Sequence, residues 1–223
     1  MPGRGIRAVL FDMDGVLVFS EEAWFLVYND TLKYFGYPPI SRPDFDAIYG
    51  SGTKADRDAH MPGRTIAEVD AAYARFFESR LDAVRPNVEA EAVLVELRSR
   101  GIRTAVATNT VSRLAHRVLG LTGLLPLLDT VASPDEAGAP KPDPAVVLLA
   151  SRRLGIPLSG CLFTGDSRYD REAAAAAPVR FVGHRFGEAG EEGGTGTGTG
   201  HERIESLREL LPLVGEPGKG TIG

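Results

Sequence analysis

The sequence predicts an α/β fold in which a Rossmann-like parallel sheet carries an inserted helical module. Two observations lead to this fold class. Short apolar runs alternate with helical patterns from about residue 86 onward, as they do when helices cover a parallel sheet. Residues 20 to 85 interrupt that alternation and contain helical periodicity alone.

The expected strands are short continuous apolar runs, which is the pattern of strands buried on both faces. The first run ends abruptly in Asp12-Met13-Asp14-Gly15, so polar residues follow its carboxyl end. Five runs qualify: Ile6–Phe11, Thr104–Ala107, Thr130–Ala132, Cys161–Phe163 and Val179–Val182.

The expected covering helices lie between these strands, and each is followed by a glycine or a proline. Gly after the last turn commonly ends a helix, and Pro cannot continue one. The predicted helices are Glu91–Arg100 ended by Gly101, Ser112–Leu119 ended by Gly120, Pro144–Leu154 ended by Gly155, and Tyr169–Ala177 ended by Pro178. A last amphipathic helix is expected at Glu202–Leu211.

The interrupting module is expected to begin with a helix capped by Ser20. A second long helix is expected from Ile66 to Val84, because apolar residues recur there at helical spacing, and Arg85-Pro86 is the expected exit. We therefore expect a core of residues 1–19 and 86–214 and a module of residues 20–85. A flexible Gly/Thr-rich loop is expected at 187–201, and a loose tail at 215–223.

Composition limits the possible partners. The chain has 223 residues, 43% of them hydrophobic and 25% charged, as in an ordinary globular protein. A net charge of −5 gives no general attraction for nucleic acid or an anionic membrane, so neither is an expected partner. The single cysteine, Cys161, rules out an intrachain disulfide, and no long apolar run predicts a membrane span. A cytoplasmic location is the expectation.

Polar groups follow several of the expected strands, where open α/β sheets form their ligand sites. They are the Asp12 and Asp14 pair, Thr108 with Asn109, Lys141 before Pro142, and Asp166 with Asp170. Each has an ordinary structural explanation, such as helix capping, a solvated loop lysine or a turn-forming aspartate. Together they supply what phosphoryl transfer needs: a nucleophile, an acid and base, oxygen ligands for a hard cation, and a positive charge.

The order and the residue sequences of these four motifs resemble those of the haloacid dehalogenase superfamily. The resemblance runs from about Ile6 to Gly183 and covers Asp12-Met13-Asp14-Gly15-Val16, Thr108-Asn109, Lys141-Pro142 and Gly165-Asp166-Ser167-x-x-Asp170. It implies an Mg²⁺-dependent phosphatase that hydrolyses a small-molecule phosphate monoester through an aspartyl-phosphate. The oligomeric state and the identity of the ester are left open.

The resemblance also implies residue roles. Asp12 matches the nucleophile, and Asp14 matches the general acid that later activates water. Thr108 matches a hydroxyl donor to the phosphoryl group, and Lys141 matches the cation that steadies the nucleophile and the phosphate. The Mg²⁺ ligands implied are Asp12, the Asp14 main-chain carbonyl and Asp166, with Asp170 as a supporting acid through water or toward Lys141.

The inserted module resembles the subclass-one cap of phosphoglycolate-phosphatase-like and β-phosphoglucomutase-like members. Such a cap would close over the site, and the segment Gly50 to Lys54 would face the substrate. Lys54 and Asn109 are therefore candidate substrate-binding residues.

Other chemistries within the superfamily are weighed against these residues. Dehalogenases and phosphonatases lack the second aspartate, which is present here as Asp14. Mutases of the β-phosphoglucomutase type carry a histidine about where Trp24 stands, so a phosphatase is favoured over a mutase. A non-catalytic binding module on the same fold and a structural Ca²⁺ site are the remaining alternatives.

Overall fold

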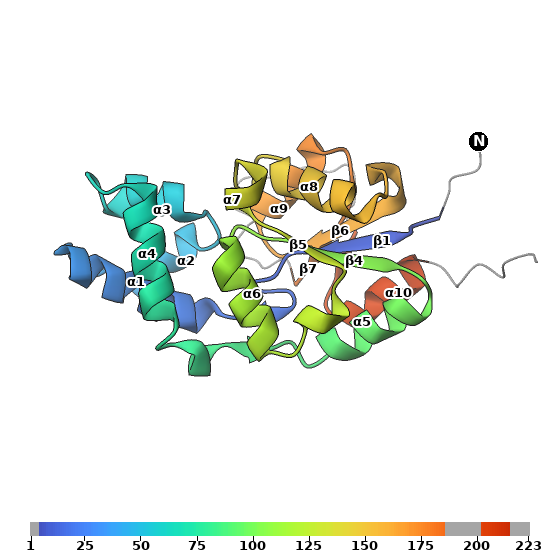
Figure 1. The fold of residues 1–223 in the computed structure, drawn as a ribbon, viewed down its shortest axis with the longest axis horizontal. Coiled ribbons are helices and arrows are strands. Elements are labelled where there is room, and N and C mark those ends of the chain that lie inside the picture. Colours follow the sequence, from blue (N-terminus) through green and yellow to red (C-terminus); the bar gives the residue numbers. More distant parts are fainter. Residues whose placement is uncertain (1–4, 186–201, 215–223) are drawn as a thin grey trace, which may run out of the picture.

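The computed structural model describes residues 5–185 and 202–214 of the chain. Within this described part the core is a six-stranded sheet in the order β5-β4-β1-β6-β7-β8 (Figure 1), and every neighbouring pair is parallel. The predicted α/β fold is confirmed. The strands are β1 (Ala8–Phe11), β4 (Arg103–Ala107), β5 (Thr130–Ala132), β6 (Cys161–Gly165), β7 (Arg180–His184) and β8 (Arg203–Ile204).

Helices cover both faces of the sheet, because alternate side chains of each strand point to opposite sides. On β1, Val9 and Phe11 join one apolar cluster, and Ala8 and Leu10 join the other. The first cluster includes side chains of α5 (Ala90–Ser99), α6 (Ser112–Leu121) and α10 (Leu210–Leu213). The second includes side chains of α8 (Ala145–Leu154) and α9 (Arg168–Ala176), with the short α7 (Pro134–Ala137) beside them (Figure 1).

The helical module lies at one end of the molecule in Figure 1 and consists of α1 (Glu21–Phe35), α2 (Arg42–Ile48), α3 (Thr53–His60) and α4 (Ile66–Phe77). Helices α1 and α4 pack together through aromatic side chains, and the rings of Trp24 and Phe77 have centroids 4.7 Å apart. The chain enters and leaves the module through an antiparallel ribbon of β2 (Val18–Phe19) and β3 (Arg85–Pro86). This ribbon was not predicted, since two-residue strands have no periodicity to recognise.

Three expected helices differ from the structure. Helix α6 continues through Gly120, and the chain turns instead at Gly123, whose φ of 75° lies in the left-handed region. The long helix expected over Ile66–Val84 ends at Phe77 and is followed by the 3₁₀ turn η1 (Leu81–Ala83). The segment Glu202–Leu211 begins as strand β8 because Ile204 is buried against β7, and only then forms η5 (Leu207–Glu209) and α10.

Two further expectations concern residues outside the part of the chain that the structure describes. The Gly/Thr-rich loop at 187–201 and the tail at 215–223 lie outside the described residues. Of the helices that are described, none combines the length and apolar character needed to cross a bilayer. The remaining 3₁₀ turns are η2 (Leu125–Leu127) and η3 (Leu158–Gly160).

Candidate active site

The carboxyl edge of the sheet brings four of the predicted residues together. Asp12 follows β1, Thr108 follows β4 and Asp166 follows β6, and these three strands are neighbours. The amide of Asp12 donates to the carbonyl of Thr164 at 2.8 Å, which anchors the start of the Asp12 loop to β6. Lys141 reaches the same edge from the loop before α8 and is almost fully buried.

Lys141 connects two of the aspartates. Its Nζ donates to Oδ1 of Asp12 at 2.7 Å, to Oδ1 of Asp170 at 2.6 Å and to the carbonyl of Ala107 at 3.0 Å. An ammonium group has three N–H donors, so all of them are used. Asp170 in turn caps α9, because its Oδ2 accepts from the Ser167 amide at 3.1 Å.

Burial and these contacts shift the ionisation of the site. Burial, together with the charge of Asp170, raises the pKa of Asp12 to about 8, although Lys141 acts in the opposite direction. For Lys141, burial alone would lower the pKa, but the carboxylates of Asp12 and Asp170 outweigh it and raise the pKa above its ordinary value. Lys141 is therefore a permanent cation.

The acidic residues fit a hard divalent cation. One ligand oxygen from each of Asp12, Asp166 and Asp170 can lie within 4.8 Å of the others. Burial and the neighbouring Asp12 raise the pKa of Asp166 well above its ordinary value. Three carboxylates against the single ammonium of Lys141 leave a net charge of −2, which a divalent ion would balance.

Gly15 keeps the space beside Asp166 free. Its φ is 77°, and a Cβ at this position would lie 1.7 Å from Oδ2 of Asp166. Only glycine allows both the left-handed turn and this close approach. The Asp12-to-Gly15 loop can therefore fold back against Asp166, and the side chains present fit the Mg²⁺ that the sequence predicts.

Asp14 is held apart from the cluster by three donors. Its Oδ1 accepts from the Ser20 hydroxyl and from Nε1 of Trp24 at 3.3 Å, and its Oδ2 accepts from the Thr110 hydroxyl at 2.9 Å. Burial raises the pKa of Asp14, while hydrogen bonds from these donors act against the rise. Ser20 was expected to cap α1, but it makes no side-chain capping bond and donates to Asp14 instead.

Thr108 and Asn109 have different surroundings. Thr108 is fully buried, and its hydroxyl oxygen accepts from the Thr110 amide at 3.0 Å, which leaves its proton for another acceptor. Asn109 donates to the carbonyls of Gly50 at 2.9 Å and Lys141 at 3.0 Å, and it accepts from the Lys141 amide at 2.6 Å. Its amide thus joins the Lys141 loop to the helical module, and both polar atoms are occupied by backbone groups.

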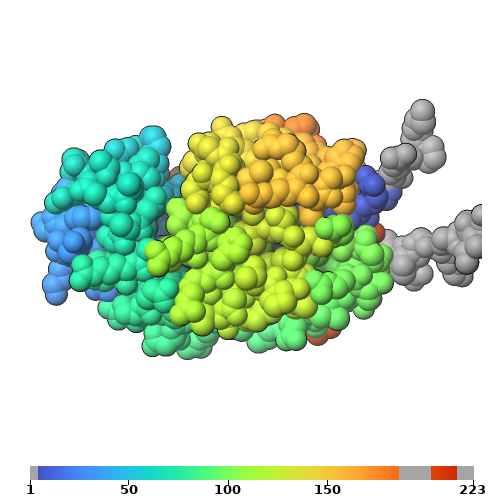
Figure 2. Space-filling view, in the orientation of Figure 1, coloured from blue at the N-terminus to red at the C-terminus, as the bar shows by residue number. Residues whose placement is uncertain are grey.

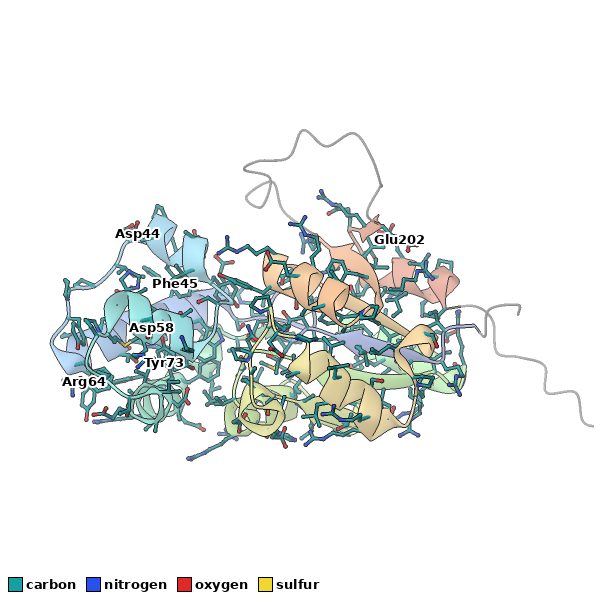
Figure 3. All side chains as sticks on the ribbon, turned by 90° about the horizontal axis from the view of Figure 1, so that it is seen from above. Asp44, Phe45, Asp58, Arg64, Tyr73 and Glu202 are labelled. Carbon is teal, nitrogen blue, oxygen red and sulfur yellow. The ribbon has the colours of Figure 1, made fainter. Side chains whose placement is uncertain are left out.

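A cleft of about 850 Å³, counted out to open solvent, lies over these residues between the core and the helical module. Figure 2 shows the boundary at which the module meets the core. The module lines the cleft with aromatic and acidic side chains, and Figure 3 labels two of the aromatic ones, Phe45 on α2 and Tyr73 on α4. The module thus supplies one wall of the site.

Lys54 does not join the other predicted residues in this conformation. Its side chain is 64% exposed, and its Nζ pairs with Asp58 at 2.8 Å. Lys54 and the preceding Thr53 belong to α3 rather than to a loop, and of the two only Thr53 lines the cleft. The role of Lys54 as a substrate contact stays a prediction.

Sequence reasoning missed several residues of the site. Trp24, Ser20 and Thr110 orient Asp14, and His184 at the end of β7 donates from Nδ1 to the carbonyl of Gly15 at 3.2 Å. His184 lies two positions past the expected strand Val179–Val182, so its place near the carboxyl edge of the sheet was a usable signal. No such signal was available for Trp24 and Ser20, because the sequence of α1 does not indicate which side of the helix faces the core.

Comparisons with known proteins agree with this geometry. A family model described as haloacid dehalogenase-like hydrolase matches residues 6–178. A phosphoglycolate phosphatase of Cereibacter sphaeroides is 30% identical over 231 residues, which cover 95% of this chain and all of that protein.

Solved structures give the same fold. A subfamily IA hydrolase of the haloacid dehalogenase superfamily from Geobacter sulfurreducens is 26% identical, with a TM-score of 0.71 over 93% of this chain and 99% of the other. A β-phosphoglucomutase from Clostridium difficile is 17% identical, with a TM-score of 0.77 over 92% of this chain and 93% of the other. At that identity the second comparison concerns the fold alone.

Proposed function

The chain belongs to the haloacid dehalogenase-like hydrolase family, and from that premise we propose that it hydrolyses a small-molecule phosphate monoester through a phosphoryl group carried on Asp12. Its phosphoglycolate phosphatase relatives make it a phosphatase of this family. The observation that supports the mechanism is the grouping of the Asp12, Asp166 and Asp170 carboxylates, two of which, Asp12 and Asp170, pair with the buried Lys141 ammonium.

In the first step an Asp12 carboxylate oxygen attacks the phosphorus, and the bond from phosphorus to the ester oxygen breaks. Asp14 gives its proton to the departing oxygen, so that an alcohol leaves rather than an alkoxide. The raised pKa of Asp14 suits a group that must hold a proton before this step. Lys141 keeps the Asp12 carboxylate in place, and the free proton of Thr108 is available to a phosphoryl oxygen.

In the second step a water oxygen attacks the phosphorus of the aspartyl-phosphate. Asp14, now a carboxylate, accepts the water proton, and the bond between phosphorus and Asp12 breaks to release inorganic phosphate. Mg²⁺, when bound through Asp12, Asp166 and the Asp14 carbonyl, would neutralise charge on the phosphoryl oxygens. The family's cap role would fall to the module of residues 20–85, whose helices line the cleft and would exclude bulk water.

The test is to trap the covalent intermediate. Rapid quenching during turnover, followed by peptide mass spectrometry, should find a phosphoryl group on the peptide that contains Asp12. Turnover with no phosphorylated peptide at any quench time would contradict the covalent route. A mutase remains the less favoured candidate, because Trp24 is a hydrogen-bond donor to Asp14 and has no basic nitrogen to exchange protons with a sugar hydroxyl.

A further inference from the structure

The charge of the cleft limits what the substrate can carry. Among the described residues that line it there are five aspartates and one lysine, with no arginine or histidine. Three of the aspartates, Asp12, Asp14 and Asp166, lie at the reacting end. The other two, Asp56 on α3 and Asp70 on α4, lie on the wall formed by the helical module.

The one basic side chain of the cleft has no donor to spare. All three N–H groups of Lys141 are used by Asp12, Asp170 and the Ala107 carbonyl. Lys141 therefore cannot also bind an anionic group at the far end of a substrate. If the leaving alcohol carried a carboxylate, that negative charge would lie near Asp56 and Asp70, and no cation among the described lining residues would offset the repulsion.

The lysine and the arginine of α3 are directed elsewhere. Lys54 and Arg57 both pair with Asp58, at 2.8 and 2.7 Å, and neither lines the cleft. Figure 3 labels Asp58 in the helical module. These two cations are held on the side of α3 that does not line the site.

When Asp56 is ionised, no cation within the described part of the chain pairs with its carboxylate. Its two oxygens accept from the hydroxyls of Ser51 at 3.0 Å and Tyr73 at 2.9 Å. Burial raises the pKa of Asp56 to about 7, with a smaller contribution from Asp70. The carboxylate retains lone pairs for a further donor, and a bound cation or hydroxyl would relieve its desolvation.

Aromatic rings enclose the same wall. Trp24 and Tyr73 have centroids 5.6 Å apart, and Tyr28 and Phe45 have centroids 5.7 Å apart; all four line the cleft. Aromatic faces attract ammonium groups and repel anions. The rings and Asp56 therefore favour the same kind of ligand.

We propose that Asp56 is a specificity-determining residue, and that the leaving alcohol of the natural ester carries hydroxyl or ammonium groups that donate to Asp56 and carries no carboxylate. This inference rests on the proposed phosphatase function and adds the substrate class. It separates this chain from the activity in the name of its phosphoglycolate phosphatase relatives, since phosphoglycolate would place a carboxylate in this cleft.

The experiment compares three six-carbon esters that differ in charge: glucosamine 6-phosphate, glucose 6-phosphate and 6-phosphogluconate, with 2-phosphoglycolate beside them. Dissociation constants are measured by calorimetry on Mg²⁺-loaded Asp12→Asn protein at about pH 8, where Asp56 is ionised. We expect the ammonium ester to bind at least about tenfold more tightly than 6-phosphogluconate, with the neutral ester between them. Adding Asp56→Asn to the Asp12→Asn protein should reduce the ratio of the dissociation constants of 6-phosphogluconate and glucosamine 6-phosphate severalfold.

The matched control is Asp46→Asn in the same background. Asp46 also belongs to the helical module, on α2, but it is exposed, pairs with Arg42 and does not line the cleft. It removes the same charge from the module, so the ratio should stay at the parent value. An equal reduction by both variants would mean that the preference reflects net charge and would overturn the role of Asp56.

Tighter binding of 6-phosphogluconate or 2-phosphoglycolate than of the neutral and ammonium esters would overturn the substrate class. If Lys54→Ala then removed that preference, Lys54 would be the substrate contact that the sequence predicts. The phosphatase proposal is tested separately, by hydrolysis of p-nitrophenyl phosphate by the unmodified enzyme. Absence of that hydrolysis would refute the catalytic proposal without altering the binding order.

Discussion

The Lys141 ammonium lies 2.7 Å from the Asp12 carboxylate, although 129 positions separate the two residues in the chain. Both side chains are buried, so their attraction is little screened by water. A buried lysine next to a carboxylate keeps that carboxylate in one orientation, as the proposed attack on phosphorus requires. The same contact requires strand β1 and the loop before α8 to fold together before the site exists.

The first prediction concerns the nucleophile. Asp12→Asn keeps the shape of the side chain but removes the attacking charge, so kcat should fall by at least about 10³-fold. Phosphate release from p-nitrophenyl phosphate measures the loss, and circular dichroism checks that the fold persists. An Asp12→Asn protein that keeps a substantial part of its turnover with Mg²⁺ present would exclude Asp12 as the nucleophile.

The second prediction concerns the metal. EDTA should abolish activity and Mg²⁺ should restore it, whereas Ca²⁺ should be a poor substitute because its larger and looser coordination shell spoils the geometry of transfer. Mg²⁺ should also raise the melting temperature of the EDTA-treated protein, because a ligand of the native state stabilises it. Asp166→Asn should reduce both effects. Full activity in excess EDTA would contradict the metal-dependent mechanism.

The third prediction concerns Trp24, which we place as a positioning residue for Asp14. Trp24→Phe retains an aromatic ring against Phe77 but removes the indole donor to Asp14. An alkyl ester needs Asp14 to protonate its leaving oxygen, whereas p-nitrophenolate departs as a stable anion. Turnover of the alkyl ester should therefore fall about tenfold, and that of p-nitrophenyl phosphate much less.

The comparison between the two esters is the control for Trp24, because a general loosening of the cleft would slow both. Equal losses would assign Trp24 a packing role only. Thr110→Val, which removes the donor to the other oxygen of Asp14, should show the same ester dependence as Trp24→Phe. Disagreement between the two variants would also count against the positioning role.

The sheet and the reacting end of the site were predictable because their signals are local. A buried parallel strand is a continuous apolar run, so the position just after it can be identified directly, as for Asp12 and Thr108. Asp166 lies three positions past its expected strand, Cys161–Phe163. The carboxyl ends of parallel strands share one edge, which places these residues together whatever the strand order. The order itself depends on side-chain packing between distant segments.

The module wall of the site was not predictable in the same way. Asp56 and Asp70 lie on helices whose apolar periodicity gives no indication of which polar side chains face the core. The prediction for Lys54 depends on a substrate-facing loop, but residues 53–60 form α3, and Lys54 pairs with Asp58. Asn109 is also a predicted substrate contact, and its amide is bonded to the backbone of Gly50 and Lys141. Its role toward the substrate stays a prediction.

The last prediction concerns the cost of burying Asp56. Its ordinary pKa is 3.8, and burial raises the pKa in the folded state to about 7. Below about pH 4 both states are protonated, and between about pH 4 and 7 only the folded state keeps the proton, so this residue makes stability fall as pH rises through that range. The charges and hydroxyls facing Asp56 are those of Asp70, Ser51, Tyr73 and Tyr28.

Asp56→Asn removes the titrating carboxyl group. Its amide keeps one oxygen for one of the two hydroxyls, and the oxygen of the other hydroxyl can accept from the new NH2 group. The melting temperature of the variant, relative to that of the unmodified protein, should therefore increase between about pH 5 and pH 8. Each kcal/mol of unfolding free energy that the ionisation of Asp56 takes from the unmodified protein should correspond to roughly 2–4 °C. Thermal melts of both proteins across that range measure the difference, with exposed Asp46→Asn as the control that should follow the unmodified protein. If the difference in melting temperature between the two proteins stayed constant with pH, Asp56 would have the same pKa in the folded and unfolded states. Its carboxylate would then not be the buried group without a cationic partner that we infer.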